Sequence, residues 1–180
     1  MDKQTQTQRF ETVVLPHLAV VYNLARWLMG NDQDAEDAVQ ESMLRAFRFI
    51  DSFRGGDARV WLLTIVRHTC FTCLSKNRHK ALEVPFEEDL HGGADSEDGA
   101  DGGTNPSAPL LLEADRMLVN RALAALSVPH REVLVLRELE DCSYHEIARI
   151  IGVPIGTVMS RLSQARRRLR EAYARVSGET

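Results

Sequence analysis

The stretch DCSYHEIARIIGVPIGTVMSRLSQARRRLR, Asp141–Arg170, predicts two helices joined by a tight turn. Ser143 and Glu146 have the S-x-x-E spacing of a capping box, in which each side chain satisfies a free backbone N–H at a helix start. Gly152 can adopt the left-handed conformation that ends a helix, and Pro154 cannot continue one. We therefore expect a helix–turn–helix, the motif that places its second helix in the DNA major groove.

The second helix of this motif has two different faces. Apolar residues at helical spacing form the face expected in a core, namely Val158, Leu162, Ala165, Leu169 and Val176. The other face is small, polar and basic, with Thr157, Ser160, Arg161, Gln164 and Arg168. These residue types contact base edges and phosphates. A helical hairpin with a solvated basic face is the alternative, but turn, cap and face agree and favour DNA binding.

Composition bounds the class of protein. The chain has 180 residues, 44% of them hydrophobic, and a formal net charge of −4, which argues against a uniformly basic nucleic-acid binder. The charge is segregated, however. Ten acidic residues and no Lys or Arg lie between Glu83 and Asp115, whereas six Arg and one acid lie between Arg161 and Arg175. This asymmetry indicates an acidic segment and a separate basic binding surface.

Three cysteines are too few for a disulfide framework, which fits a reducing cytoplasm. We find no apolar run of the roughly 18 residues that a membrane span needs, and the chain opens without a signal peptide. We therefore expect a cytoplasmic protein with no direct membrane insertion.

Helical periodicity predicts three helices before the acidic segment. They run from about Arg9 to Met29, with a break or kink at Pro16, from Asp34 to Ile50, and from about Ala58 to Lys80. The second helix is expected to bury Ala35, Ala38, Val39, Ser42, Met43, Ala46, Phe47 and Ile50. It leaves an acidic face outside, with Asp37, Gln40, Glu41 and Leu44. From spacing alone, an ordinary solvated surface is the better interpretation of that face.

The third helix is expected to bury Ala58, Leu62, Ile65, Val66, Thr69 and Cys73, and to turn Thr64, Arg67, His68, Phe71, Ser75 and Arg78 outward. An exposed Phe among basic and hydroxyl residues suits single-stranded nucleic acid, because bases stack on aromatic rings and phosphates meet positive charge. Packing of Phe71 against a neighbouring element is an equally good interpretation.

The same helix contains the string His68-Thr69-Cys70-Phe71-Thr72-Cys73, which invites a zinc or redox interpretation. On a continuous helix the His points far away from both cysteines, so the three cannot converge on one ion. A buried free cysteine behaves as a small hydrophobe, so a structural role is favoured for Cys70 and Cys73. We predict no metal and no cofactor. The sequence also shows no acid–base pair, nucleophile set or cofactor loop of an enzyme.

Residues 83–110 are dominated by Gly, Asp, Ser and Pro and predict a flexible acidic linker. Four more helices are expected over residues 111–180, with Pro129 as a first helical residue. The fold class is therefore all-α: two small helical domains, of three and four helices, over residues 1–82 and 111–180. Because such a linker cannot fix the two domains, we expect weak contacts or a partner to hold them together.

Three segments together are similar to a known family. They are DAEDAVQESMLRAF, FRGGDARVWLLTIVRHT and LSVPHREVLVLRELEDCSYHEIARIIGVPIGTVMSRLSQARRRLR. In order and spacing they resemble the extracytoplasmic-function (ECF) sigma factors of the sigma-70 family, over nearly the whole chain except the linker. The resemblance implies that the first domain is sigma region 2 and the last domain is sigma region 4.

The resemblance also implies functional residues. The helix Asp34–Arg48 would bind the clamp helices of the largest subunit of RNA polymerase, through Asp34, Asp37, Gln40, Glu41 and Leu44. Region 2 would melt the promoter −10 element and hold a flipped base through Arg54, Trp61, Arg67, His68, Phe71 and Arg78. Region 4 would contact the −35 element through Thr157, Ser160, Arg161, Gln164, Arg166 and Arg168. The linker would follow the RNA channel of the polymerase.

The partners that the resemblance implies are core polymerase, promoter DNA and an anti-sigma factor, without a small-molecule substrate. Two alternatives stay open. One is an autonomous helix–turn–helix regulator, which would bind duplex DNA without polymerase. The other is a redox or metal sensor through Cys70 and Cys73.

Overall fold

The structure, a computed structural model, describes residues 3–83 and 107–178 of the 180-residue chain. Over these two ranges every regular element is a helix, as the sequence predicts. The first range folds into α1 (Lys3–Val14), η1 (Leu15–His17), α2 (Leu18–Met29), α3 (Asp32–Phe49), η2 (Ile50–Ser52) and α4 (Ala58–Glu83). The second range folds into α5 (Ser107–Ala124), α6 (Val128–Leu134), η3 (Val135–Leu139), α7 (Tyr144–Ile151) and α8 (Ile155–Ser177).

The ends of the predicted linker are helical. Glu83 is the last residue of α4, and α5 begins at Ser107, four residues before the predicted start of the second domain at residue 111. The remainder of that linker, residues 84–106, lies outside the described residues. We refer below to α1–α4 as the first half of the chain and to α5–α8 as the second half.

Pro16 divides the first predicted helix into α1 and α2, because a proline nitrogen carries no N–H for the helical hydrogen bond. The 3₁₀ turn Leu15–His17 forms at this point. Although we expected no membrane-length run, the segment Thr5–Met29 is long and apolar enough to span one by length and composition alone. The 3₁₀ turn interrupts this segment. Leu24 and Leu28 are buried, as expected of a helix in a protein core.

Local sequence signals set the start of α3. Gly30 has φ 80° and ends α2 in the left-handed conformation. Asn31 then caps α3, because its side-chain oxygen accepts a hydrogen bond from the backbone N–H of Asp34 at 2.8 Å. The helix begins at Asp32, two residues earlier than predicted, because Asn31 caps it at that point.

The helix–turn–helix forms as predicted. The backbone N–H of Ser143 donates to Oε2 of Glu146 at 2.6 Å, and the backbone N–H of Glu146 donates to Oγ of Ser143 at 3.3 Å, which completes the capping box. Gly152 has φ 70° and ends α7, and α8 begins directly after Pro154.

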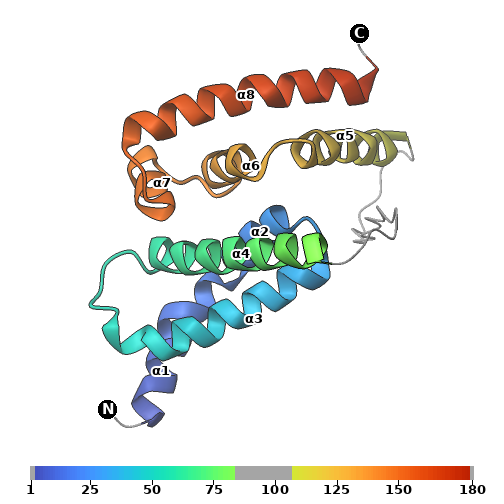
Figure 1. The fold of residues 1–180 in the computed structure, drawn as a ribbon. Coiled ribbons are helices and arrows are strands. Elements are labelled where there is room, and N and C mark those ends of the chain that lie inside the picture. The colour runs from blue at the N-terminus through green and yellow to red at the C-terminus, as the bar shows by residue number, and fades with distance from the viewer. Residues whose placement is uncertain (1–2, 84–106, 179–180) are drawn as a thin grey trace.

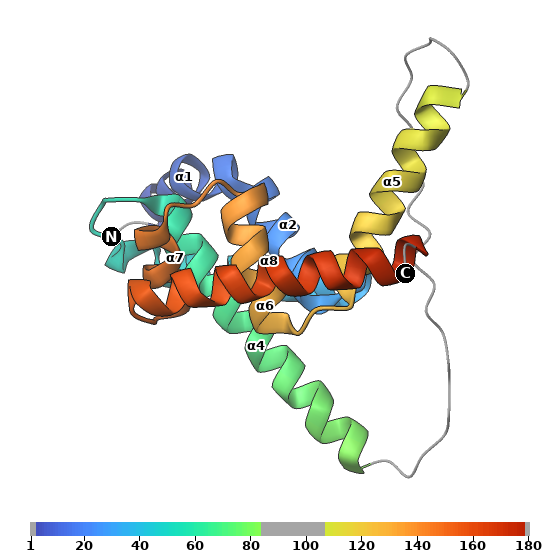
Figure 2. The same cartoon turned by 90° about the horizontal axis from the view of Figure 1, so that it is seen from above.

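The two halves pack directly on each other. Figure 1 shows α1–α4 as one layer and α5–α8 as a second layer, with α6 and α7 lying between α8 and α4, and Figure 2 shows α8 crossing over α6. Helix α7 packs on α4, and α6 packs on α2. Buried side chains of both halves form a single hydrophobic cluster.

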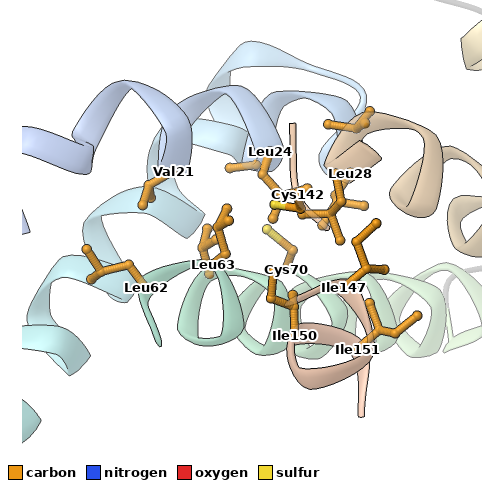
Figure 3. Close-up of a cluster of buried hydrophobic side chains, with 14 of the residues drawn as sticks. Val21, Leu24, Leu28, Leu62, Leu63, Cys70, Cys142, Ile147, Ile150 and Ile151 are labelled. Carbon is orange, nitrogen blue, oxygen red and sulfur yellow. The ribbon is translucent and has the colours of Figure 1, made fainter. Parts of the chain in front are cut away.

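This close packing differs from the expectation of loosely held domains. Figure 3 shows part of the shared cluster, in which Leu24 and Leu28 of α2 and Leu63 of α4 lie near Ile147 and Ile150 of α7. Apolar area removed from water stabilises such a contact by roughly 25 cal/mol per Å². Burial of this shared cluster therefore stabilises the contact between the halves.

Most predicted core positions are buried, but one position of α3 is not. Phe47 is 37% exposed and packs edge-on against Phe10 of α1, with ring centroids 5.3 Å apart. Helical spacing places Phe47 on the inner face, but α1 covers that edge of α3 only in part.

We predict that Ser143→Ala lowers the free energy of unfolding by about 1 kcal/mol, because it removes one half of the capping box of α7. Chemical denaturation followed by circular dichroism measures this change. Ser75→Ala, at an exposed position inside α4, is the control and should change stability little. Equal stability of the two variants would contradict a role for the cap.

Candidate nucleic-acid interface

Helix α8 presents the predicted polar face to the outside. Val158, Leu162 and Ala165 are buried against the rest of the second half, together with Ala172, which was not predicted. Of the polar residues on the other side, Ser160, Gln164, Arg166 and Arg168 are exposed, and Thr157 and Arg161 are half-buried. The structure thus brings all six predicted −35 residues onto one helix that follows a tight turn, and four of them are open to a ligand.

Two of these side chains have partners inside the second half. Arg166 donates through Nε and Nη2 to Oε1 of Glu138, at 3.1 and 2.7 Å. Gln164 Oε1 lies 3.5 Å from Nε2 of His130, at the outer limit of a hydrogen bond. Arg166 is therefore already paired, which makes Arg168 the better candidate for a free phosphate contact.

The loop before α4 contains the first of the predicted −10 residues. Trp61 packs on Phe53, with ring centroids 5.0 Å apart, and Arg54 is exposed in the loop. Gly55 and Gly56 both have positive φ, at 94° and 96°, which explains why this turn carries two glycines. The ring contact anchors the loop to α4 while Arg54 stays free to meet an anionic ligand.

Arg67 and Phe71 form a pair along α4. The guanidinium carbon of Arg67 lies 4.5 Å from the centroid of the Phe71 ring, within the range of a cation–π contact. Phe71 is half-buried, so the structure combines the two interpretations that its sequence context allowed. His68 and Arg78 are exposed as predicted.

Arg67 also contacts the second half of the chain. Its Nε lies 2.6 Å from Oε1 of Glu132, which is a residue of α6. Only 16% of the Arg67 side chain and none of the Glu132 side chain is exposed. Sequence spacing predicted that Arg67 points outward. The prediction did not take the covering half into account, because no local pattern reports a partner 65 residues away.

Glu132 is the most unusual ionisable group of this interface. Desolvation raises the pKa of its carboxyl, and the nearby charge and hydrogen bond of Arg67 oppose that rise. The charge of Arg161 in the recognition helix opposes it as well, more weakly. Its second oxygen, Oε2, is buried and has no hydrogen-bond partner. This carboxylate therefore depends on neighbouring arginines from both halves.

Further polar contacts between the halves surround this pair. Nη2 of Arg59 lies 3.5 Å from Oε2 of Glu140 and also donates to the Glu140 backbone carbonyl. Asn23 of α2 donates to Oε1 of the same Glu140. Nη1 of Arg131 donates to the backbone carbonyl of Trp27 at 2.9 Å.

These contacts between the halves were not predicted from the sequence. The available signal was a pair of carboxylates, Glu132 and Glu140, at the two ends of the apolar segment VLVLREL. A carboxylate that is buried beside such a segment needs a cationic partner.

The acidic face of α3 lies on the outside of the first half. Asp37, Gln40 and Glu41 are exposed, and Leu44 is 63% exposed. Arg45 contacts Glu41 at 2.8 Å within the helix. Asp34 is the exception in the predicted set, because its carboxylate accepts a hydrogen bond from the capping Asn31 at 2.9 Å.

The cysteines fit the structural interpretation. Cys70 and Cys142 are fully buried and Cys73 is half-buried. Burial raises the pKa of Cys70 to about 12 and that of Cys142 to about 11, so both stay protonated thiols at neutral pH. Among the described residues, no group of three His, Cys, Asp or Glu side chains is placed to hold a metal ion.

Both halves match known families. A family described as Sigma-70 region 2 matches residues 13–80, and one described as Sigma-70, region 4, matches residues 116–169. The ECF RNA polymerase sigma factor SigE of Mycolicibacterium smegmatis is 31% identical over 179 residues, which are 98% of this chain and 66% of that protein. The ECF RNA polymerase sigma-E factor of Salmonella typhimurium is 37% identical over 139 residues, which are 74% of this chain and 70% of that protein.

This chain therefore spans about two thirds of the length of these two relatives. Among solved structures, the sigma factor RpoE in complex with the anti-sigma factor NepR from Bartonella quintana is similar with a TM-score of 0.72 and 30% identity. That similarity covers 91% of this chain and 95% of the other, so it takes in both halves.

Proposed function

The chain belongs to the extracytoplasmic-function sigma factors of the sigma-70 family, and from this premise we propose that it binds core RNA polymerase and directs transcription initiation at specific promoters. In this proposal residues 1–82 act as region 2 and residues 111–180 act as region 4. The protein is a binding subunit in the cytoplasm and leaves the chemistry of RNA synthesis to the polymerase.

Recognition of the −35 element is assigned to α8. The observation that carries this assignment is the exposed polar face of a helix that follows a capped turn and a left-handed glycine. Arg161 and Gln164 lie in the first turns of α8, which enter the major groove, where Arg pairs with guanine and Gln with adenine. Ser160 and Thr157 border them, and Arg168 lies farther along, where phosphate is the expected ligand.

Recognition and melting of the −10 element is assigned to the loop before α4 and to the outer side of α4. Arg54 and Arg78 supply exposed positive charge, Trp61 and Phe71 supply aromatic surface, and His68 lies between them on α4. Single-stranded DNA binds to this combination because bases stack on aromatic rings while phosphates contact cations.

Polymerase binding is assigned to the exposed face of α3 that contains Asp37, Gln40, Glu41 and Leu44. An exposed leucine surrounded by acidic and polar groups suits a protein partner with an apolar contact and a basic rim. The clamp helices of the largest polymerase subunit are the proposed partner. Asp34 is expected to act indirectly, since it stabilises the start of α3.

We also propose that an anti-sigma factor controls this chain. The similar sigma factor from Bartonella quintana was crystallised in complex with an anti-sigma factor. That similarity extends over both halves, so this chain shares the fold of a sigma factor that an anti-sigma factor binds.

Run-off transcription with purified core polymerase over a genomic promoter library tests the proposed function. We expect initiation at a small set of promoters only when both core polymerase and this protein are present. A chain that binds duplex DNA specifically but gives no transcripts with core polymerase would instead be an autonomous helix–turn–helix regulator.

We predict that the double variant Asp37→Lys/Glu41→Lys binds core polymerase at least about tenfold more weakly, because it inverts the charge of the α3 face. Affinity is measured by titration of labelled protein with core polymerase. The matched control is Glu11→Lys/Asp115→Lys, which changes two exposed acids elsewhere by the same net charge. Equal loss in both double variants would mean that net charge, and not this face, determines binding.

We predict different effects for two arginines of α8. Arg161→Ala should lower activity mainly at promoters with an intact −35 element and relax the preference there, since one bidentate base contact contributes about 1–3 kcal/mol of discrimination. Arg168→Ala should weaken all promoters alike and lower the salt slope of binding by about one unit. A randomised −35 library assayed at several salt concentrations separates the two. A uniform loss in Arg161→Ala would assign that residue to positioning.

A further inference from the structure

We propose that His130 of α6 is a positioning residue for the −35 contact. Its ring holds the side-chain amide of Gln164 in α8, so that this amide presents its NH₂ group to the major groove. The proposal rests on the proposed function in one respect, namely that α8 enters the groove of the −35 element. It gives a role in base selection to a residue that lies outside the recognition helix and outside the predicted −35 set.

The first observation is how the start of α6 uses its N-cap. Ser127 is the N-cap residue and has an extended backbone, but its side chain caps no backbone N–H. The backbone N–H groups of His130 and Arg131 both donate to the Ser127 carbonyl, each at 3.0 Å. The Ser127 hydroxyl lies 2.7 Å from Nδ1 of the His130 ring. A hydroxyl that at most helix starts caps the backbone therefore fixes an imidazole ring here.

The second observation is that the other nitrogen of this ring faces the recognition helix. Helix α8 crosses over α6 (Figure 2), and the two helices pack on each other. Nε2 of His130 lies 3.5 Å from Oε1 of Gln164, at the outer limit of a hydrogen bond. His130 is half-buried, whereas Gln164 is exposed. Because Ser127 restrains the ring at Nδ1, the ring gives an exposed side chain a fixed neighbour.

The donors and acceptors of the three side chains are mutually consistent. Oε1 of Gln164 can only accept a hydrogen bond, so Nε2 of His130 carries the proton of this contact. In the neutral ring Nδ1 is then an acceptor, and the Ser127 hydroxyl donates to it. A directed chain of hydrogen bonds thus runs from Ser127 through His130 to Gln164, and we call this chain the tether.

The tether determines which part of Gln164 meets DNA. The oxygen and the nitrogen of a side-chain amide point apart, so an Oε1 directed at His130 turns Nε2, a donor, away from the ring. A donor pairs with the acceptors of the major groove, which are N7 and O6 of guanine, N7 of adenine and O4 of thymine. An untethered glutamine pairs bidentately with adenine, for which it needs Oε1 as the acceptor from N6. The tether therefore shifts the preference of Gln164 from adenine toward guanine and disfavours cytosine, which offers only a donor.

A randomised −35 library, transcribed by core polymerase with the full chain, tests the tether. Gln164→Ala first identifies the base pair that Gln164 reads, as the position at which preference is lost. At that position His130→Ala should raise the ratio of adenine to guanine at least about threefold, which is the effect expected from the loss of one hydrogen bond. Ser127→Ala should change the ratio in the same direction, because it frees the ring.

Three controls separate positioning from other roles. His130→Gln keeps an N–H donor of similar reach and should retain the preference of the unaltered chain. His17→Ala removes a half-buried histidine of the first half and should retain it as well. In the Gln164→Ala background His130→Ala should leave the base preference unchanged, because the amide on which the ring acts is missing. If His130→Ala fails to fold, as judged by circular dichroism, Ser127→Ala decides the outcome.

Unchanged base preference in His130→Ala and Ser127→Ala would overturn the tether and leave the proposed function intact. So would a Gln164→Ala variant that keeps full preference at every position. A change in preference that persists without Gln164, or a uniform loss at all promoters in His130→Ala, would also overturn the tether, since His130 would then contact DNA itself. An unaltered chain without any −35 preference in this library would instead overturn the assignment of α8 to the −35 element, and the tether with it.

Discussion

A carboxylate without solvent exposure, Glu132, forms an ion pair with Arg67 across the two halves of the chain. Removing one partner of a buried pair typically costs about 3–5 kcal/mol, because the other charge is left desolvated and unpaired. The ion pair therefore favours the packed arrangement of the halves, in which the charge of each group is compensated by the other.

Much of the fold follows from local sequence. The capping box of Ser143 and Glu146, the left-handed Gly152 and the proline at position 16 each specify a helix boundary through interactions within a few residues. Helical spacing likewise identifies Val158, Leu162 and Ala165 as buried positions of α8, whereas the predicted Leu169 and Val176 are half-buried. Such features are predictable because the atoms that satisfy them are close in the chain.

Contacts between the halves were not predictable in the same way. Arg67 and Glu132 are separated by 65 residues, and periodicity assigns a side chain to a face without showing what lies against that face. For the same reason spacing placed Phe47 inside, where α1 covers it only in part, and placed Arg67 outside, where α6 covers it. Family resemblance indicates which residues are functional, whereas only the folded chain shows which side chains lie against them.

The position of Glu132 links the two proposed DNA-binding helices. Its Oε1 pairs with Arg67 of α4, and the charge of Arg161 in α8 also lowers the pKa of the same carboxyl. One buried carboxylate thus depends on a cation from each proposed DNA-binding helix, because a charge without solvent exposure needs compensation from its neighbours.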